Sequence, residues 1–192
     1  MFKALLVYSH LIAACVAIAI IFFQDCAMMV KRGRALDQKA IDELKRGSDL
    51  IIAVLIMLWV SGLALVIMGQ ANNPEYLLNQ KLWAKFTVVS ILTLNGLVLH
   101  AFSFPIVTSP KGILGATGTG QLLVFATAVI SLVSWLFACY LGIARHWNNV
   151  APYTYVMTVY TVILSVSMIG GLFYLRYWRT GSIPLMHKFL KI

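Results

Sequence analysis

Five long runs of apolar residues divide this chain and leave few folds open to it. The runs cover approximately residues 4–30, 49–70, 82–104, 121–144 and 153–175, and each has the roughly 20 residues that a helix needs to cross a bilayer. Only 11% of the residues are charged, whereas soluble domains average about 25%. A soluble core of this size has no room for so much apolar surface. The pattern predicts an all-α integral membrane protein, with five transmembrane helices in a single membrane domain.

Lysine and arginine are unevenly distributed between the two sets of loops. Most lie before the second run, between the third and fourth runs, or after the fifth: Lys31, Arg32, Arg34, Lys39, Lys45, Arg46, Lys111, Arg176, Arg179, Lys188 and Lys191. Because cytoplasmic loops carry an excess of basic residues, we expect the N-terminus outside and the C-terminus in the cytoplasm, with an interfacial tail over residues 180–192. The net charge of +9 then indicates membrane lipids as partners, and not a nucleic acid.

The segments between the runs have predicted structures of their own. Residues 31–49 carry interspersed acids and bases that are compatible with a short loop helix, and Ser48-Asp49 is typical of an N-cap for the second transmembrane helix. Pro105 predicts the end of the third helix. Residues 112–120 are rich in glycine but lack the Gly-Lys-Ser/Thr ending of a phosphate loop, so we expect a flexible connector there.

A few polar residues lie well inside the runs, and they carry the functional signal. His10 and Asp25 lie in the first run, and Lys85 and His100 lie in the third. A charged group in the hydrocarbon is costly and is therefore a candidate for function. With about 1.5 Å of rise per residue, His10 and Lys85 share a level near the outer face, and Asp25 and His100 share a level roughly 18 Å further in.

A contact between the first and third helices would bring these residues together. His10, Ala14 and Ala17 fall on one face of the first helix, and Lys85 and Gly96 share a face of the third. Small residues allow membrane helices to approach closely. A contact between these two helices is therefore a hypothesis, because no spacing rule requires them to be neighbours.

Three of the four candidates also have explanations without function. Lys85 is close enough to the outer face for its ammonium group to reach the lipid headgroups. Asp25 could pair with Lys31 or Arg32 at the end of its helix. His100 could simply lie at the membrane interface. These alternatives stay open at the level of the residues.

His10 is the strongest candidate for a cofactor ligand. A histidine within an apolar run usually faces the bundle interior, and imidazole is a common ligand of haem iron. His10 and His100 are too far apart along the membrane normal to hold one haem. A haem would use His10 with Lys85 beside it, or His100 with another group at the inner level. Copper is the alternative metal, with thiol and thioether ligands from the inner side: Cys26, Met28, Met29 and Met57.

Two marks of the first half are shared with a known superfamily. They are the early histidine, His10 in YSHLIAACVAIAIIFFQD, and a Trp-x-Lys opening of the third run, Trp83-Ala84-Lys85. Over about residues 5–105 the chain resembles the small bacterial inner-membrane proteins that include CopD-type copper-resistance proteins and HemJ-type protoporphyrinogen oxidases. The resemblance implies a bacterial inner-membrane location and a haem b. His10 would be an axial ligand, and Lys85 a ligand or a partner for a propionate or substrate carboxylate.

Three functions are compatible with these features. The first is a haem-binding membrane protein with a redox role, in electron transfer or porphyrinogen oxidation. The second is copper handling or transport, which needs a polar track between the two levels; Thr87, Ser90, Thr93 and Asn95 of the third run are candidates for it. The third is a non-catalytic accessory subunit of a larger complex or a homo-oligomer, suggested by the aromatic-rich last two runs. No Ser-His-Asp order or pair of carboxylates indicates a hydrolase.

Overall fold

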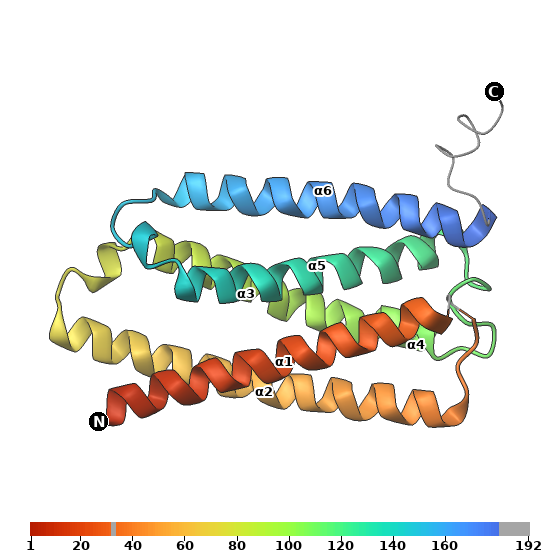
Figure 1. Ribbon diagram of the computed structural model, residues 1–192, viewed down its shortest axis with the longest axis horizontal. Coiled ribbons are helices and arrows are strands. Elements are labelled where there is room, and N and C mark those ends of the chain that lie inside the picture. Colours follow the sequence, from red (N-terminus) through yellow and green to blue (C-terminus); the bar gives the residue numbers. More distant parts are fainter. Residues whose placement is uncertain (32–33, 181–192) are drawn as a thin grey trace.

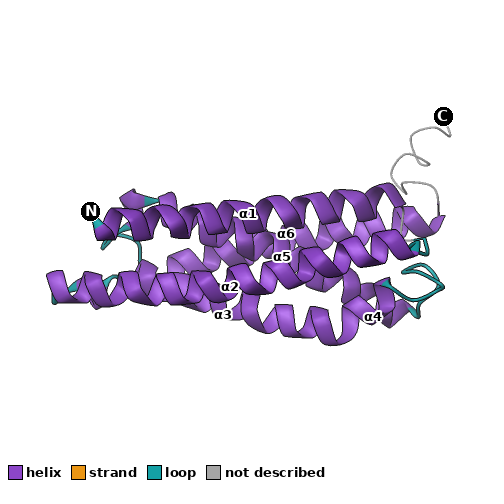
Figure 2. Cartoon of the chain, turned by 90° about the horizontal axis from the view of Figure 1, so that it is seen from below, coloured by secondary structure: helices purple, strands orange, loops and turns teal. Residues whose placement is uncertain are grey.

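The computed structural model of this chain describes residues 1–31 and 34–180. Helices make up 86% of the structure, and no strand occurs in the described part (Figure 2). Five helices are long and apolar enough to cross a membrane, and Figure 1 shows them side by side along a common axis. This confirms the all-α fold with five potential membrane spans. Their bounds are Phe2–Lys31 (α1), Gln38–Asn72 (α2), Gln80–Val98 (α3), Gly118–Ile143 (α5) and Tyr153–Thr180 (α6).

The two ends of the bundle differ in composition. One end, here called the His10 end, holds the N-terminus, the end of α2 and the start of α3, together with the short helices Tyr76–Leu78 (η1) and Arg145–Trp147 (η3) (Figure 1, left). The other, here called the basic end, holds the loop from α1 to α2. The predicted membrane orientation of the two ends stays a prediction, and the predicted interfacial tail lies outside the described residues from position 181 onward.

The helix α2 begins earlier than the sequence predicted. It runs without interruption over Gln38–Asn72, so the expected helix in this segment is present but is continuous with the membrane span, and the expected N-cap at Ser48-Asp49 is wrong. The N-terminal flank is Asp37, in extended conformation. The segment between Asp37 and Ser48 is rich in Lys, Ala, Glu and Leu, which favour helix, and it holds no proline. A helix that is already formed therefore enters the membrane span directly.

The third membrane span also continues past its predicted end. A π-helical turn over Leu99–Ser103 (η2) follows α3, and the short helix Phe104–Val107 (α4) follows that turn. In the π turn the Phe104 N–H donates to the carbonyl of Leu99, five residues back. Pro105 then stands in the first turn of α4, where a missing N–H costs little. The predicted stop at Pro105 is therefore wrong, and the apolar span reaches Val107.

The helix α5 lies at the centre of the bundle. It packs against α1, α3 and α6, whereas α1 packs mainly along α2. Within its apolar span, 33% of the residues are buried inside the protein, compared with 11–22% for the other spans. The connection before α5 is held by Gln121, whose amide donates to the carbonyls of Leu114 and Ala116. Hydrogen bonds thus anchor this connection, which was expected to be flexible, to α5.

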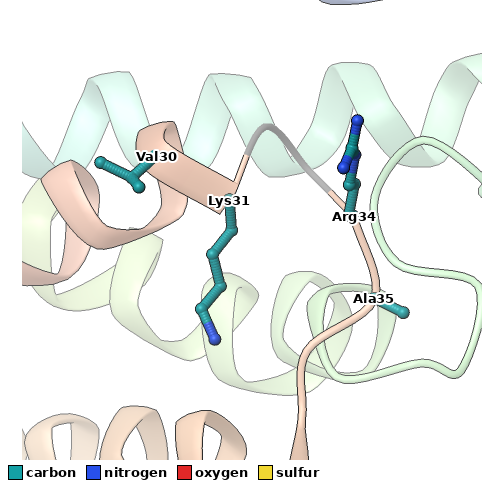
Figure 3. A pocket seen from close by; sticks show the side chains of 4 residues that line it. All are labelled: Val30, Lys31, Arg34 and Ala35. Carbon is teal, nitrogen blue, oxygen red and sulfur yellow. The ribbon is translucent and has the colours of Figure 1, made fainter.

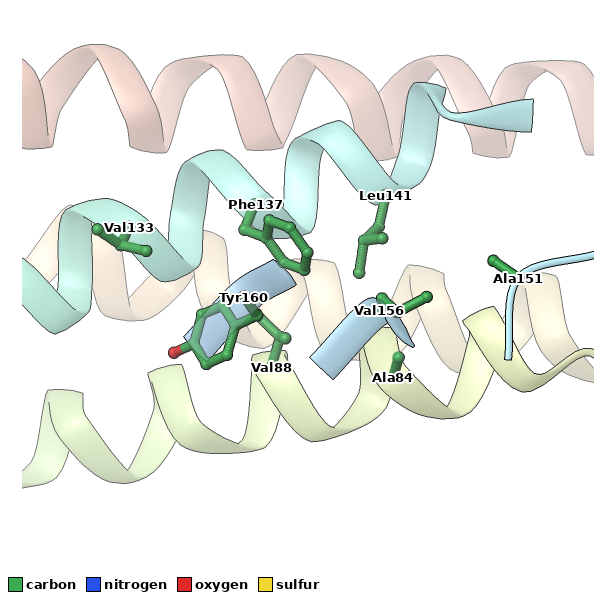
Figure 4. Close-up of a cluster of buried hydrophobic side chains, with 8 residues drawn as sticks. All are labelled: Ala84, Val88, Val133, Phe137, Leu141, Ala151, Val156 and Tyr160. Atoms are coloured by element: carbon green, nitrogen blue, oxygen red, sulfur yellow. The ribbon is translucent and has the colours of Figure 1, made fainter. Parts of the chain in front are cut away.

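Three apolar clusters hold the described helices together, and the two larger ones lie between the long helices. The first joins α3, α5 and α6 (Figure 4) and consists of Ala84, Val88, Val133, Phe137, Leu141, Ala151, Val156 and Tyr160. The second joins α1, α2, α3 and α5 and consists of Ala13, Ala17, Ile21, Val54, Leu92 and Trp135. The first and third helices both contribute to this second cluster, but α1 packs mainly against α2 and α5, whereas α3 packs mainly against α5 and α6; a direct contact between the first and third helices stays a prediction. The expected close approach at Gly96 is wrong, because a side chain there would meet no described atom within 4 Å.

Candidate functional site

The imidazole of His10 on α1 is held by α2. Its Nδ1 lies 2.7 Å from the Oγ of Ser61. Ser61 is buried, and its Oγ lies 2.7 Å from the carbonyl oxygen of Met57, one turn earlier on the same helix. Gly62 leaves room beside the ring, since a Cβ there would lie 3.5 Å from Cε1 of His10. The Ser-Gly pair of α2 therefore forms one wall of a slot for the imidazole.

One assignment of the protons gives Ser61 a donor and an acceptor role at once, and it implies a tautomer for His10. A serine hydroxyl has one hydrogen, and Ser61 donates it to the Met57 carbonyl. In this assignment its oxygen accepts a hydrogen bond from Nδ1–H of His10. A neutral imidazole has a single N–H, so Nε2 carries the free lone pair, and no described residue donates to it. Histidines that ligate metals show this arrangement, with the other ring nitrogen donating to a protein acceptor.

Lys85 of α3 lies at the same end of the bundle as His10. Its ammonium group is within electrostatic range of the His10 imidazole and of the Cys139 thiol. Within the described part of the chain it makes no hydrogen bond and no ion pair. Gly142 of α5 lies next to it, because a Cβ there would be 3.6 Å from Nζ. The structure thus places His10 and Lys85 at one end of the bundle and within electrostatic range of each other, on helices that are distant in sequence.

Lys81, one turn before Lys85, has a different environment. Its Nζ donates to the carbonyl oxygen of Ala144 at 2.9 Å, and the residue is only 7% exposed. That carbonyl closes the C-terminal end of α5. Lys81 therefore satisfies its charge on a helix terminus, where a cation is favourable. Of these two neighbouring lysines, Lys85 is the one left without a partner among the described residues.

Asp25 does not acquire the partner that the sequence suggested. It is half-buried on α1 and has no hydrogen bond or ion pair with a described residue. Lys31 instead bonds Asp37 at 2.6 Å, and Arg32 lies outside the described residues. The ammonium of Lys31 holds the pKa of the exposed Asp37 carboxyl below its usual value. Pairing with Lys31 therefore does not account for Asp25.

His100 lies in the π turn at the basic end, far from His10. Its Nε2 is 3.5 Å from Ser48 Oγ on α2, which is a long contact. The neighbouring polar groups of this span close onto α5. Asn95 Nδ2 donates to the Thr127 carbonyl at 2.9 Å, and Ser103 Oγ lies 2.8 Å from Thr127 Oγ1. This end thus contains a satisfied polar network, with His100 at its edge.

The polar residues of α3 turn toward different helices. Thr87 Oγ1 lies 3.1 Å from the hydroxyl of Tyr153 on α6. Thr93 accepts a hydrogen bond from Trp59 Nε1 of α2 at 3.0 Å, and Asn95 binds α5. Thr87, Thr93 and Asn95 thus tie α3 to three neighbouring helices, and the polar track for transport stays a prediction.

The sulfur-bearing residues proposed as copper ligands lie in different surroundings. Cys26 is exposed, as are Met29 and Met57, whereas Met28 packs against an apolar cluster of the basic end. Within residues 1–31 and 34–180, no group of three His, Cys, Asp or Glu side chains could hold a metal ion.

The partner of His10 is the site residue that the sequence did not reveal. Ser61 stood out only as one polar residue of the second run. Its signal was its place beside Gly62 in the middle of an apolar helix, where a hydroxyl needs an acceptor and a small neighbour admits a ring. Which helix would supply that ring is not encoded in the periodicity of either run.

Comparison of the chain with protein-family models, with curated proteins and with solved structures found no match.

Proposed function

We propose that this chain is a membrane protein of the bacterial inner membrane that binds haem b through His10 and has a redox role. The observation that carries the proposal is that His10 Nδ1 is bonded to Ser61 while His10 Nε2 has no described partner, and that the ammonium of Lys85, also without a described partner, lies within electrostatic range. A membrane helix rarely holds an unpaired cation without function. A haem presents both of the groups that these residues lack, an iron atom for the imidazole and propionates for the ammonium.

The donor set fits this cofactor. The porphyrin supplies the in-plane nitrogens, so one imidazole is a sufficient protein ligand. Ser61 sets the tautomer and the orientation of the ring, and a hydrogen bond to Nδ1–H raises the basicity of the ligating nitrogen. Gly62 and Gly142 keep side chains away from Cε1 of His10 and Nζ of Lys85. The two glycines thus let the imidazole and the ammonium approach the backbones of α2 and α5 closely.

Bound haem would supply one-electron chemistry, while the residues of the chain set its environment. The ammonium of Lys85 would stabilise a carboxylate where water is scarce, because charge interactions are stronger at low dielectric. The same ammonium would orient the carboxylates of a porphyrinogen substrate, or those of the haem in an electron carrier. Both redox roles rest on the same pair of residues.

The test is an absorption spectrum of the full-length protein, purified after expression with ample haem. We expect a Soret band that is lost in His10→Ala and retained in His100→Ala, which removes an imidazole from the other end of the bundle. Absence of the band from the wild type would refute haem binding. A band that survives in His10→Ala would show that another residue is the ligand.

A further inference from the structure

A groove opens between α1 and α2 at the basic end, away from His10 and Lys85. It encloses about 370 Å³, which is within the usual range for ligand sites. Its walls are mainly small and apolar: Ala19, Phe23 and Ala27 of α1, and Ala40, Leu44 and Gly47 of α2. The phenyl ring of Phe23 remains largely exposed at 73%. The groove therefore faces the lipid phase and is shaped to take an apolar chain.

A glutamine bridges the two walls of the groove. Gln24 of α1 donates from Nε2 to the Leu44 carbonyl of α2 at 3.1 Å. Its amide lies over Gly47, where any Cβ would collide with it. The glycine thus permits the bridge, and the bridge holds α1 and α2 at a fixed separation. This makes the groove a formed feature of the fold and not a gap between loosely packed helices.

The rim of the groove carries one charge of each sign on opposite walls. Lys31 lines it from α1 and Glu43 from α2. Lys31 shares its ammonium with Asp37, whereas Glu43 has no ion pair in the described structure. Arg34 does not line the groove; it lines a second hollow together with Val30, Lys31 and Ala35, and its side chain points away from that of Lys31 (Figure 3). The rim therefore presents an unpaired acid together with a cation that has ammonium protons to spare.

From this arrangement we propose that the groove binds a phospholipid with an ethanolamine headgroup. One acyl chain lies along the apolar walls, the phosphate accepts hydrogen bonds from Lys31, and the primary ammonium donates to Glu43. A glycerol headgroup brings the phosphate charge and no cation, so Glu43 would repel it. A choline headgroup has a cation that cannot donate a hydrogen bond. Of these three headgroups, only ethanolamine matches both sides of the rim.

The experiment is native mass spectrometry of the full-length protein, incubated with an equimolar mixture of dioleoyl phosphatidylethanolamine, phosphatidylglycerol and phosphatidylcholine. We expect the ethanolamine lipid to be retained about threefold more than either competitor, the scale of one partly exposed ion pair. Glu43→Gln should lower its retention to that of the choline lipid. Arg34→Gln is the matched control, because it removes a charge from the same loop but not from the groove, and it should leave the ranking unchanged.

A second variant tests the apolar part of the groove. Ala27→Trp places a large side chain on the α1 wall and should reduce the retention of all three lipids together. Helical content and elution from a sizing column verify that each variant is folded. Equal retention of the three lipids by the wild type, preferred retention of the glycerol lipid, or an unchanged preference in Glu43→Gln would each overturn the proposal.

Discussion

The two ends of the bundle hold similar polar residues but satisfy them differently. At the His10 end, one imidazole nitrogen is bonded at 2.7 Å and the other is free, and the ammonium of Lys85 has no described partner. At the basic end, Ser103 and Asn95 close onto α5. The contact of His100 is long, at 3.5 Å. Polar groups that are fully paired hold helices together, whereas groups held in place but left open are available to a ligand.

Asp25 is the exception at the basic end. It is half-buried and has no described partner, and no charged group of the described residues acts on it, whereas the free acid Glu43 lies on α2. A lone acid can be accommodated by protonation, while the His10 end combines a fixed donor nitrogen with a cation. The comparison therefore teaches that the combination, and not a single unusual residue, separates a binding site from a tolerated defect.

The largest effect on this comparison is expected from the two serines that face the two histidines. Ser61→Ala removes the acceptor of His10 Nδ1–H and should weaken haem binding roughly 10- to 100-fold, because the ring loses its tautomer and its orientation. Ser48→Ala removes the long contact of His100 and should leave haem binding unchanged. Haem titration followed at the Soret band measures both. The ¹⁵N chemical shifts of His10 provide a second measurement that does not depend on haem.

Equal effects of the two serine variants would break the comparison. An unchanged His10 tautomer in Ser61→Ala would show that the slot, and not the hydroxyl, orients the ring.

The next largest effects are expected from the two lysines of α3, whose replacement should change the stability of the protein in opposite directions. Lys85→Met removes a cation without a described partner, and an unpaired charge is costly in a membrane bundle. The variant should therefore raise the free energy of unfolding of the haem-free protein by roughly 1 kcal/mol. Lys81→Met removes the hydrogen bond to the Ala144 carbonyl and should lower stability by a similar amount. Thermal unfolding of the purified proteins in one detergent measures both changes. Destabilisation by Lys85→Met would show that the ammonium is already satisfied.

Sequence patterns were sufficient to predict the membrane spans but not the ends of the helices. The length of each apolar run decides whether it can cross a bilayer, so the five spans were predictable. The ends of the helices were not. The start of α2 was placed at Ser48-Asp49, but the preceding segment is itself a good helix and merges with the span. The π turn at Leu99–Ser103 carries the chain past Pro105, and no local pattern announces such a turn.

The site was only partly predictable for a different reason. Depth along a helix follows from counting residues, so a shared level for His10 and Lys85 could be proposed. Lateral packing depends on which helices become neighbours, and many arrangements satisfy the same periodicity. The expected approach at Gly96 therefore failed, and the contact of His10 with Ser61 was not foreseen. The pairing of Lys31 with Asp37 depends on how the loop turns, which charge counting does not give.

A smaller effect is expected from the paired network of the basic end. Ser103→Ala removes the hydrogen bond to Thr127 at 2.8 Å and should destabilise the protein by about 0.6 kcal/mol, the typical size for a hydrogen bond between membrane helices. Thr127 keeps its bonds to the backbone of its own helix, which limits the loss. The Soret band should be unaffected. A loss of haem in this variant would extend the cofactor site to the basic end.

The smallest effect is expected from the ion pair of the first loop. Lys31 lowers the pKa of Asp37, so any stabilisation is present above the ordinary carboxyl pKa and is lost as the pH falls through the lowered value. Because both groups are solvated, with exposed fractions of 37% and 66%, Asp37→Asn should leave the melting temperature at neutral pH unchanged in physiological salt. Melting curves from neutral pH to below about 4, recorded for both proteins, provide the measurement. A marked loss of stability in Asp37→Asn at neutral pH would mean that this bond fixes how α1 joins α2, and that the basic end depends on its charges as closely as the His10 end does.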